Sequence, residues 1–207
     1  MSPDDLRHAL RRAASALKAD GPPFALAGSF ALWAHGAPEP THDVDFVVAE
    51  SDVEAAAAAL ANAGFDIRRP PEDWLFKAGL SVDGPAVVDV LHQINRVPVD
   101  SGMIAGAPVL DVFALSMPVL PPSEVMLQKL RSLHEHHCDF AKLLPVARGV
   151  REQLDWVALR EQVADNPFAT TFLDLCARLG IDESTPDSQL TGSTDMLCQR
   201  YSRAGPE

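Results

Sequence analysis

The sequence predicts an α+β fold, in which a small mixed sheet with flanking helices is followed by a helical carboxyl-terminal part. Up to about residue 122, short apolar runs bounded by Gly and Pro alternate with helical segments. From Ser123 onward, apolar residues recur only at helical spacing. A segment with both strands and helices, followed by a segment with helices alone, is typical of the α+β class. We therefore expect one lobe over residues 1–122 and a helical lobe with a polar tail over 123–207.

The elements of the first lobe are predicted from the spacing of apolar residues and from the Gly and Pro residues that end each segment. Helical periodicity marks a first helix, which Gly21 ends. Ser51 and Glu54 have the spacing of a capping box and predict a helix ending near Gly64. Short apolar or alternating runs predict strands at 24–27, 43–48, 65–68, 74–80 and 86–94, with a short helix at 30–35. Prolines interrupt residues 95–122, which stay unassigned.

The second lobe reads as a series of amphipathic helices that ends at Gly180. A last short helix is expected at 196–201. Composition agrees with a globular protein, since 47% of the 207 residues are hydrophobic and 22% are charged.

Apolar segments, cysteine spacing and net charge indicate where the protein is located and which partners it can have. No apolar stretch approaches the roughly 20 residues that a membrane helix needs, and no secretory signal is visible. The three cysteines are widely spaced and fit free thiols in a reducing compartment. We therefore expect a cytoplasmic protein without a membrane partner. The net charge of −12 argues against bulk electrostatic coating of nucleic acid.

Two acids on the second predicted strand are the first candidates for chemistry. Side chains alternate along a strand, so Asp43 and Asp45 project to the same side. Neighbouring carboxylates repel unless a cation lies between them, and Mg²⁺ prefers such hard oxygen ligands. A solvent-exposed sheet face is the ordinary alternative for two such acids.

A turn before that strand offers an anion site. Gly28 allows close approach of the backbone to a ligand, and Ser29 begins a helix whose free amides favour phosphate. Asp89 adds a third carboxylate, because it interrupts the apolar run 87–91. A lone buried Asp is costly unless it is paired, so Asp89 either caps something locally or joins a metal site. A nucleoside triphosphate with its metal needs both kinds of site.

These residues resemble a known signature. Gly28-Ser29, an interval of 13 residues, Asp43-x-Asp45 and the later Asp89 are similar to the DNA polymerase β-like nucleotidyltransferase superfamily. The chain looks most like its AbiEii/MenT-type toxin branch of type IV toxin–antitoxin systems. Residues 124–130, with Lys129, and 138–144, with Asp139, are similar to two helical motifs of that branch. Relatives often carry Arg four residues before the first metal Asp, where this chain has Glu39.

The resemblance implies a role for each matched residue and a catalytic lobe over residues 1–122. Asp43 and Asp45 would hold two Mg²⁺ or Mn²⁺ ions, and Asp89 would share one and help deprotonate the attacking hydroxyl. Gly28 and Ser29 would bind the triphosphate, which Lys129 would neutralise, and Asp139 would orient Lys129. Two metals placed in this way support in-line displacement of pyrophosphate.

The same resemblance implies a function. The expected activity moves a nucleoside monophosphate from an NTP to a hydroxyl, with the 3′ end of tRNA as acceptor, and so blocks translation; a cognate antitoxin is a possible partner. The basic faces of the first helix (Arg7, Arg11, Arg12, Lys18) and of the later helices (Lys129, Arg131, Lys142, Arg148, Arg151) offer limited support for RNA. Alternatives are nucleotidylation of a small molecule, such as an aminoglycoside or lincosamide, or of a partner protein, or a non-catalytic nucleotide-binding module.

One further cluster invites a metal interpretation. His134, His137 and Cys138 would fall on one face of a helix. Structural zinc ligands usually come from separated segments, so we expect an ordinary surface helix end here.

Overall fold

A computed structural model describes residues 2–182 of the chain. The predicted helix at 196–201 and Cys198 lie outside these residues. The elements are, in chain order, α1 (Pro3–Asp20), β1 (Phe24–Ala27), α2 (Gly28–Ala34), β2 (Val44–Val48), η1 (Glu50–Asp52), α3 (Val53–Asn62), β3 (Asp66–Arg68), β4 (Leu75–Gly79), β5 (Ala86–Leu91), β6 (Gln93–Ile94), β7 (Val97–Pro98), α4 (Ser101–Ala105), β8 (Val109–Val112), β9 (Leu115–Pro118), α5 (Pro122–Arg131), α6 (Phe140–Val150), η2 (Arg151–Gln153), α7 (Trp156–Gln162) and α8 (Pro167–Arg178).

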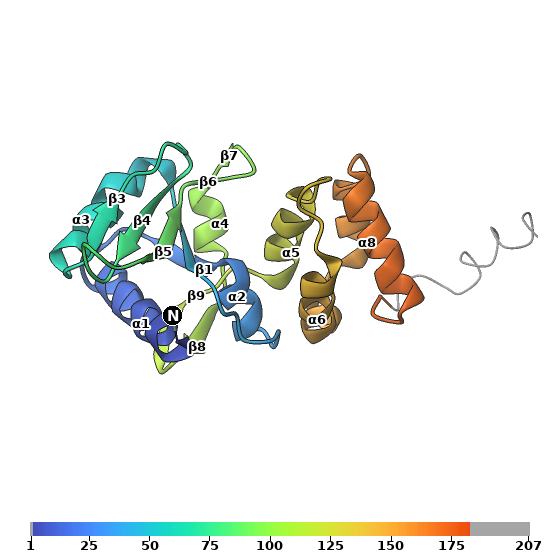
Figure 1. Cartoon of the computed structure of the whole chain (residues 1–207), viewed down its shortest axis with the longest axis horizontal. Helices are drawn as coiled ribbons and strands as arrows, with labels where there is room; N and C mark the ends of the chain where they lie inside the picture. Colours follow the sequence, from blue (N-terminus) through green and yellow to red (C-terminus); the bar gives the residue numbers. More distant parts are fainter. Residues whose placement is uncertain (1, 183–207) are drawn as a thin grey trace, which may run out of the picture.

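The central element is a mixed five-stranded sheet in the order β1-β2-β5-β4-β3 (Figure 1). Strands β2 and β5 are parallel, and the other neighbouring pairs are antiparallel. Helices α5 to α8 come after this sheet in the chain and lie together to the right of it in Figure 1. The α+β fold class, a small mixed sheet with flanking helices and a helical carboxyl-terminal part, is therefore confirmed.

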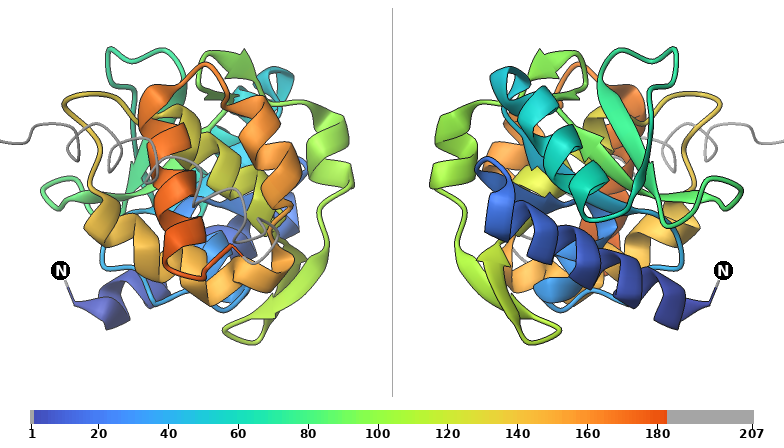
Figure 2. Two further views of the ribbon diagram at one scale, coloured as in Figure 1. Left: turned by 90° about the vertical axis from the view of Figure 1, so that its right-hand side faces the viewer. Right: turned by 90° about the vertical axis from the view of Figure 1, so that its left-hand side faces the viewer.

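Helices α1 and α3 lie side by side against one face of the sheet (Figure 2, right). The apolar stripe of α1 is buried, and Ser2 and Asp5 form a capping box at its start. This leaves the opposite face of the sheet free to present side chains toward α2 and α5.

Several predicted boundaries shift. The strand expected at 86–94 divides into β5 and β6, because β6 leaves the sheet to form a hairpin with β7. The unassigned stretch 95–122 contains β7, α4 and the β8–β9 hairpin. The capping box predicted at Ser51 and Glu54 is wrong. Helix α3 starts after a 3₁₀ turn, the side chain of its N-cap Asp52 makes no capping hydrogen bond, and Glu54 pairs with Arg69 at 2.8 Å.

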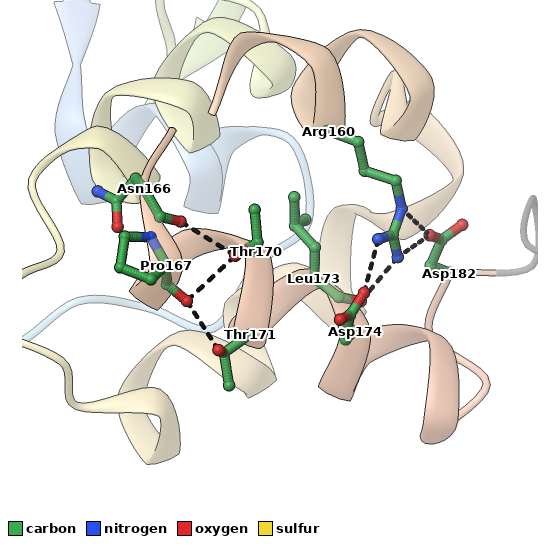
Figure 3. Close-up of polar contacts among 8 residues, drawn as sticks. All are labelled: Arg160, Asn166, Pro167, Thr170, Thr171, Leu173, Asp174 and Asp182. Atoms are coloured by element: carbon green, nitrogen blue, oxygen red, sulfur yellow. Dashed lines mark hydrogen bonds and ion pairs between the residues drawn. The ribbon is translucent and has the colours of Figure 1, made fainter. Parts of the chain in front are cut away.

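The carboxyl-terminal helices are held together by a buried ion pair (Figure 3). Arg160 of α7 donates to Asp182, whose side chain is fully buried, and to the more exposed Asp174 of α8. Asn166 caps α8 and reaches back to the Leu133 carbonyl beyond α5 at 3.0 Å. Most of the described buried apolar side chains form one cluster, which includes members of both parts of the chain. The predicted division after residue 122 stays a prediction.

Among residues 2–182, every helix is too short or too polar to cross a lipid bilayer. Of the cysteines in this range, Cys138 is exposed, Cys176 is buried, and both are free thiols. Burial raises the pKa of the Cys176 thiol to about 12.

Candidate active site

Two of the predicted carboxylates, Asp45 and Asp89, lie on one row of the sheet, and the third, Asp43, lies just before it. Asp45 of β2 and Asp89 of β5 are direct partners in the parallel register, so their side chains leave the same face. Asp43 lies one residue before β2 and is exposed, whereas Asp89 is only 7% exposed. The charges of Asp89 and Asp43 both act on Asp45. The structure thus brings together the three acids that the sequence singled out.

The backbone of Gly28 lies in close contact with the carboxylate of Asp45. Gly28 opens α2 with a φ of +57°, and a Cβ built on it would overlap Oδ2 of Asp45. Only glycine therefore allows the carboxylate to lie against this turn. The predicted helix start moves two residues earlier, since α2 begins at Gly28 rather than Phe30.

Ser29 and Lys129 are distant in the sequence but are joined by a hydrogen bond. Lys129 of α5 donates from Nζ to the Ser29 hydroxyl at 3.1 Å. Burial lowers the pKa of Lys129, and the negative charge of Asp45 opposes that shift. The ammonium therefore lies at Ser29 and close enough to Asp45 to feel its charge.

Burial is the main influence on the acids themselves. Burial and, to a smaller extent, the charge of Asp89 together raise the pKa of Asp45 to about 7. Burial also raises the pKa of Asp89, although the hydrogen bonds from Lys77 oppose this effect. With all three acids ionised, the site carries three negative charges against the two nearby lysines, which is the electrostatic condition for attracting a cation.

Lys77 was not among the predicted residues. It is the register partner of Asp89 on β4, and its Nζ donates to both carboxylate oxygens at 2.7 and 2.6 Å. A signal was present in the sequence, since Lys77 interrupts an apolar strand just as Asp89 does. The two strands are joined by the turn predicted at residues 82–85, so hairpin pairing would have aligned them.

Asp139 does not contact Lys129 as the resemblance implied. It is the N-cap of α6, where its side chain accepts from the Lys142 amide, and it forms an ion pair with Lys142 Nζ at 3.1 Å. In the described chain, Lys129 is instead positioned by the hydrogen bond that it donates to the Ser29 hydroxyl. The reason is local: an Asp just before a helix satisfies free amides of the first turn.

A cavity of about 880 Å³ adjoins this group. Its wall includes Ser29 and Lys129, so it opens directly onto the turn and the lysine. The rest of the wall comes from residues 38–42, from residues 132, 133 and 135–139 after α5, and from α6. The cavity is large enough for a drug-sized or nucleotide-sized ligand.

Glu39 lines this cavity and is already neutralised. Arg7 of α1 donates to its two oxygens, from Nε and from Nη2, each at 2.7 Å. This bidentate pair lowers the pKa of Glu39. A guanidinium from α1 thus reaches the position where relatives of the resembled family often carry Arg.

The histidine cluster is not a helix face. His134 and His137 bridge a turn beyond the end of α5, and the side chains from His134 to Cys138 are exposed. The predicted sharing of one helical face is therefore wrong, while their surface position agrees with the prediction.

Whether the acids fit a divalent ion can be judged from the donor set. Within residues 2–182, no three His, Cys, Asp or Glu side chains are already gathered around a common point for a metal. The chemistry of Asp43, Asp45 and Asp89 nevertheless fits Mg²⁺ or Mn²⁺, because all three offer hard oxygens and their charges repel. Nζ of Lys77 already donates to both oxygens of Asp89, so a metal ligated there would share these oxygens with the lysine or displace it.

Comparison with known proteins identifies the fold. No protein-family model matches the sequence, and no curated protein matches it significantly. A crystal structure of ANT(2″)-Ia in complex with adenylyl-2″-tobramycin is similar, with a TM-score of 0.56 and 13% identity over 80% of this chain and 98% of that one. The solution structure of the antibiotic-resistance factor ANT(2″)-Ia gives a TM-score of 0.52 and 13% identity over 86% and 97%. The chain therefore has the nucleotidyltransferase fold.

Proposed function

We propose that this protein transfers a nucleoside monophosphate from an NTP to a hydroxyl acceptor, assisted by Mg²⁺ or Mn²⁺. One observation carries the proposal. Asp45 and Asp89 are register partners beside the Gly28-Ser29 turn, where Lys129 reaches Ser29 at the edge of the cavity. The anion site formed by Ser29 and Lys129 thus lines the pocket, and Asp45 of the acidic row lies against the neighbouring Gly28. A metal-bound triphosphate requires such an anion site beside a group of acids.

The residues divide the work as follows. Ser29 and Lys129 would hold the triphosphate, and Asp43 and Asp45 would hold the divalent ions together with Asp89. Such ions, when bound, promote ionisation of the attacking hydroxyl and stabilise the charge on the leaving group. The acceptor oxygen forms a bond to the α-phosphorus, the bond to the bridging oxygen breaks, and pyrophosphate leaves. Asp89 takes the proton of the acceptor hydroxyl.

The geometry favours a small hydroxylated acceptor. The cavity is a defined pocket, and three of the four cations on α1 are held within the chain. Arg7 pairs with Glu39, Arg12 donates to the Ala63 carbonyl, and Lys18 donates to the Ser116 carbonyl. These contacts weaken the predicted basic track for a phosphate backbone. The similar fold of ANT(2″)-Ia, solved with adenylyl-2″-tobramycin, supports testing aminoglycosides first.

The 3′ end of tRNA is the second candidate acceptor, and it rests on the sequence resemblance to the AbiEii/MenT-type branch. A single-stranded tRNA end is narrow enough to enter the pocket without an extended basic surface. In that case the protein acts as a translation-blocking toxin with a cognate antitoxin.

Label transfer distinguishes these possibilities. Purified protein is incubated with each α-³²P-labelled NTP, Mg²⁺ or Mn²⁺, and separate pools of aminoglycosides and lincosamides, total tRNA, and protein. Transfer RNA whose 3′ end has been oxidised with periodate is the control for the tRNA arm. We expect label on a small molecule. Label on intact tRNA alone would select the second acceptor, and binding of NTP without transfer to any pool would indicate a nucleotide-binding module.

A further inference from the structure

Lys77, Asp89 and Asp45 form a continuous row across three neighbouring strands. Lys77 is opposite Asp89 in the antiparallel β4–β5 register, and Asp89 is opposite Asp45 in the parallel β2–β5 register. All three side chains therefore leave the same face of the sheet. The lysine is at the β4 end of this row, away from the Gly28-Ser29 turn.

The contact between Lys77 and Asp89 uses the whole carboxylate. Nζ is 2.7 Å from one oxygen and 2.6 Å from the other. The Asp89 side chain is 10% exposed, whereas that of Lys77 is 33% exposed. The carboxylate is therefore fixed in place, while the lysine has access to solvent and room to withdraw.

The neighbouring charges explain why a cation belongs there. Asp89 and Asp45 are adjacent, partly buried carboxylates whose negative charges repel. Removing the partner of a buried charge is strongly destabilising. Lys129 already lies on the Asp45 side, so Lys77 supplies the corresponding positive charge on the Asp89 side.

We propose that Lys77 is a resident counter-ion that positions Asp89 in the metal-free protein and competes with the divalent cation for its carboxylate. The inference rests on the proposed function only in assuming that Asp89 ligates the metal. Metal binding displaces Nζ from at least one oxygen, and the flexible lysine side chain moves toward solvent. Lys77 is thus a positioning residue that sets how tightly the site binds its metal.

Two opposite effects follow from removing the lysine charge. The metal-free protein loses stability, because Asp89 and Asp45 are left with less compensation. The affinity for a divalent cation rises, because its competitor is gone and the net charge around the acids becomes more negative. A residue that merely supports the fold would produce only the first effect.

The test measures Mn²⁺ binding to the full chain, without nucleotide or acceptor, from the electron paramagnetic resonance signal of free Mn²⁺. Lys77→Met is expected to bind Mn²⁺ at least roughly fivefold more tightly than wild type. Its thermal midpoint is expected to be lower without metal and to rise more on adding Mn²⁺. Lys77→Arg keeps a cation at Asp89 and is expected to stay near the wild-type affinity.

Arg68→Met is the matched control. Arg68 is the next residue in the same row, the register partner of Lys77, but it pairs with Asp66 at 2.6 Å. Its loss is expected to leave the Mn²⁺ affinity within about twofold, since its charge is one strand further from Asp89. Lys77→Gln replaces Lys77→Met if the latter does not fold, and it is also expected to bind Mn²⁺ more tightly.

Each outcome is decisive. Unchanged or weaker Mn²⁺ binding by the folded neutral variant would overturn the counter-ion role while leaving the proposed function intact. Equal tightening in Arg68→Met would also overturn it, because the effect would then be one of general charge. If neither wild type nor Lys77→Met nor Lys77→Gln binds Mn²⁺, the metal site itself is rejected, and with it both proposals.

Discussion

The carboxylate of Asp45 lies directly against the backbone of Gly28, so closely that a Cβ on residue 28 would overlap Oδ2. The two residues belong to consecutive parts of the motif, the turn after β1 and strand β2. Their contact fixes the distance between the expected phosphate site and the row of acids. The same glycine has a φ of +57°, which ordinary side chains rarely adopt.

Gly28→Ala is expected to reduce nucleotidyl transfer about 100-fold or more, because displacing Asp45 by even about 1 Å misplaces the reacting groups. It should also lower the free energy of unfolding by about 1–3 kcal/mol, from the collision and the left-handed backbone. Steady-state transfer and urea unfolding measure the two effects.

Gly180→Ala provides the matched control. Gly180 has a similar φ of +62°, but nothing lies within 4 Å of the position that a Cβ would take there. It should lose about 1 kcal/mol from the backbone alone and retain wild-type transfer. Equal loss of transfer in both alanine variants would show that collision with Asp45 is not the cause.

Asp45→Asn is expected to change how stability depends on pH in the metal-free protein. The folded-state pKa of Asp45 is about 7, above its ordinary value of 3.8, so the folded protein holds this proton more tightly than the unfolded chain. Its contribution to stability is therefore complete below about pH 4 and is lost as the pH rises through about 7. Wild type should lose stability relative to Asp45→Asn between about pH 5 and pH 8, on the order of 2 kcal/mol. Parallel thermal-midpoint profiles over this range would contradict the shift.

Lys129→Met is expected to lower transfer by about 100-fold or more, because the positive charge beside Ser29 is lost where the triphosphate gains charge. Arg131→Met is the control, since Arg131 is on the same helix but contacts Gln162 instead. Its transfer rate should stay within about twofold of wild type. Similar rates for Lys129→Met and wild type would remove Lys129 from the site.

Asp182→Asn tests the ion pair that closes the helical part of the chain. The side chain of Asp182 is fully buried against Arg160, whereas that of Asp174 is 65% exposed. Breaking the buried pair should cost about 3 kcal/mol of unfolding free energy, and Asp174→Asn less than about 1 kcal/mol. Equal urea midpoints for the two variants would contradict this assignment.

The sequence predicted the acids because their signal is local. Asp43 and Asp45 precede or belong to a buried strand, and Asp89 interrupts another. Each apolar strand fixes which side its acid faces, and parallel pairing of β2 with β5 brings Asp45 and Asp89 together. The strand–turn–helix unit around Gly28 is equally local.

Other features depend on contacts between distant segments, which periodicity does not report. Lys77 acquires its role only through the β4–β5 register, and Arg7 meets Glu39 only because α1 packs beside the loop before β2. The implied contact between Asp139 and Lys129 was displaced by a local cap on α6. The cavity likewise exists only where Ser29 and the loop at residues 38–42 meet the helical part of the chain.

The central claim is that the row of acids carries nucleotidyl transfer, and Asp45→Asn tests it most directly. Release of pyrophosphate and transfer of α-³²P label are measured for wild type and the variant, each verified as folded by circular dichroism. We predict metal-dependent release and transfer by wild type, with both reduced to background in Asp45→Asn. Near-wild-type transfer by the folded variant would contradict the claim.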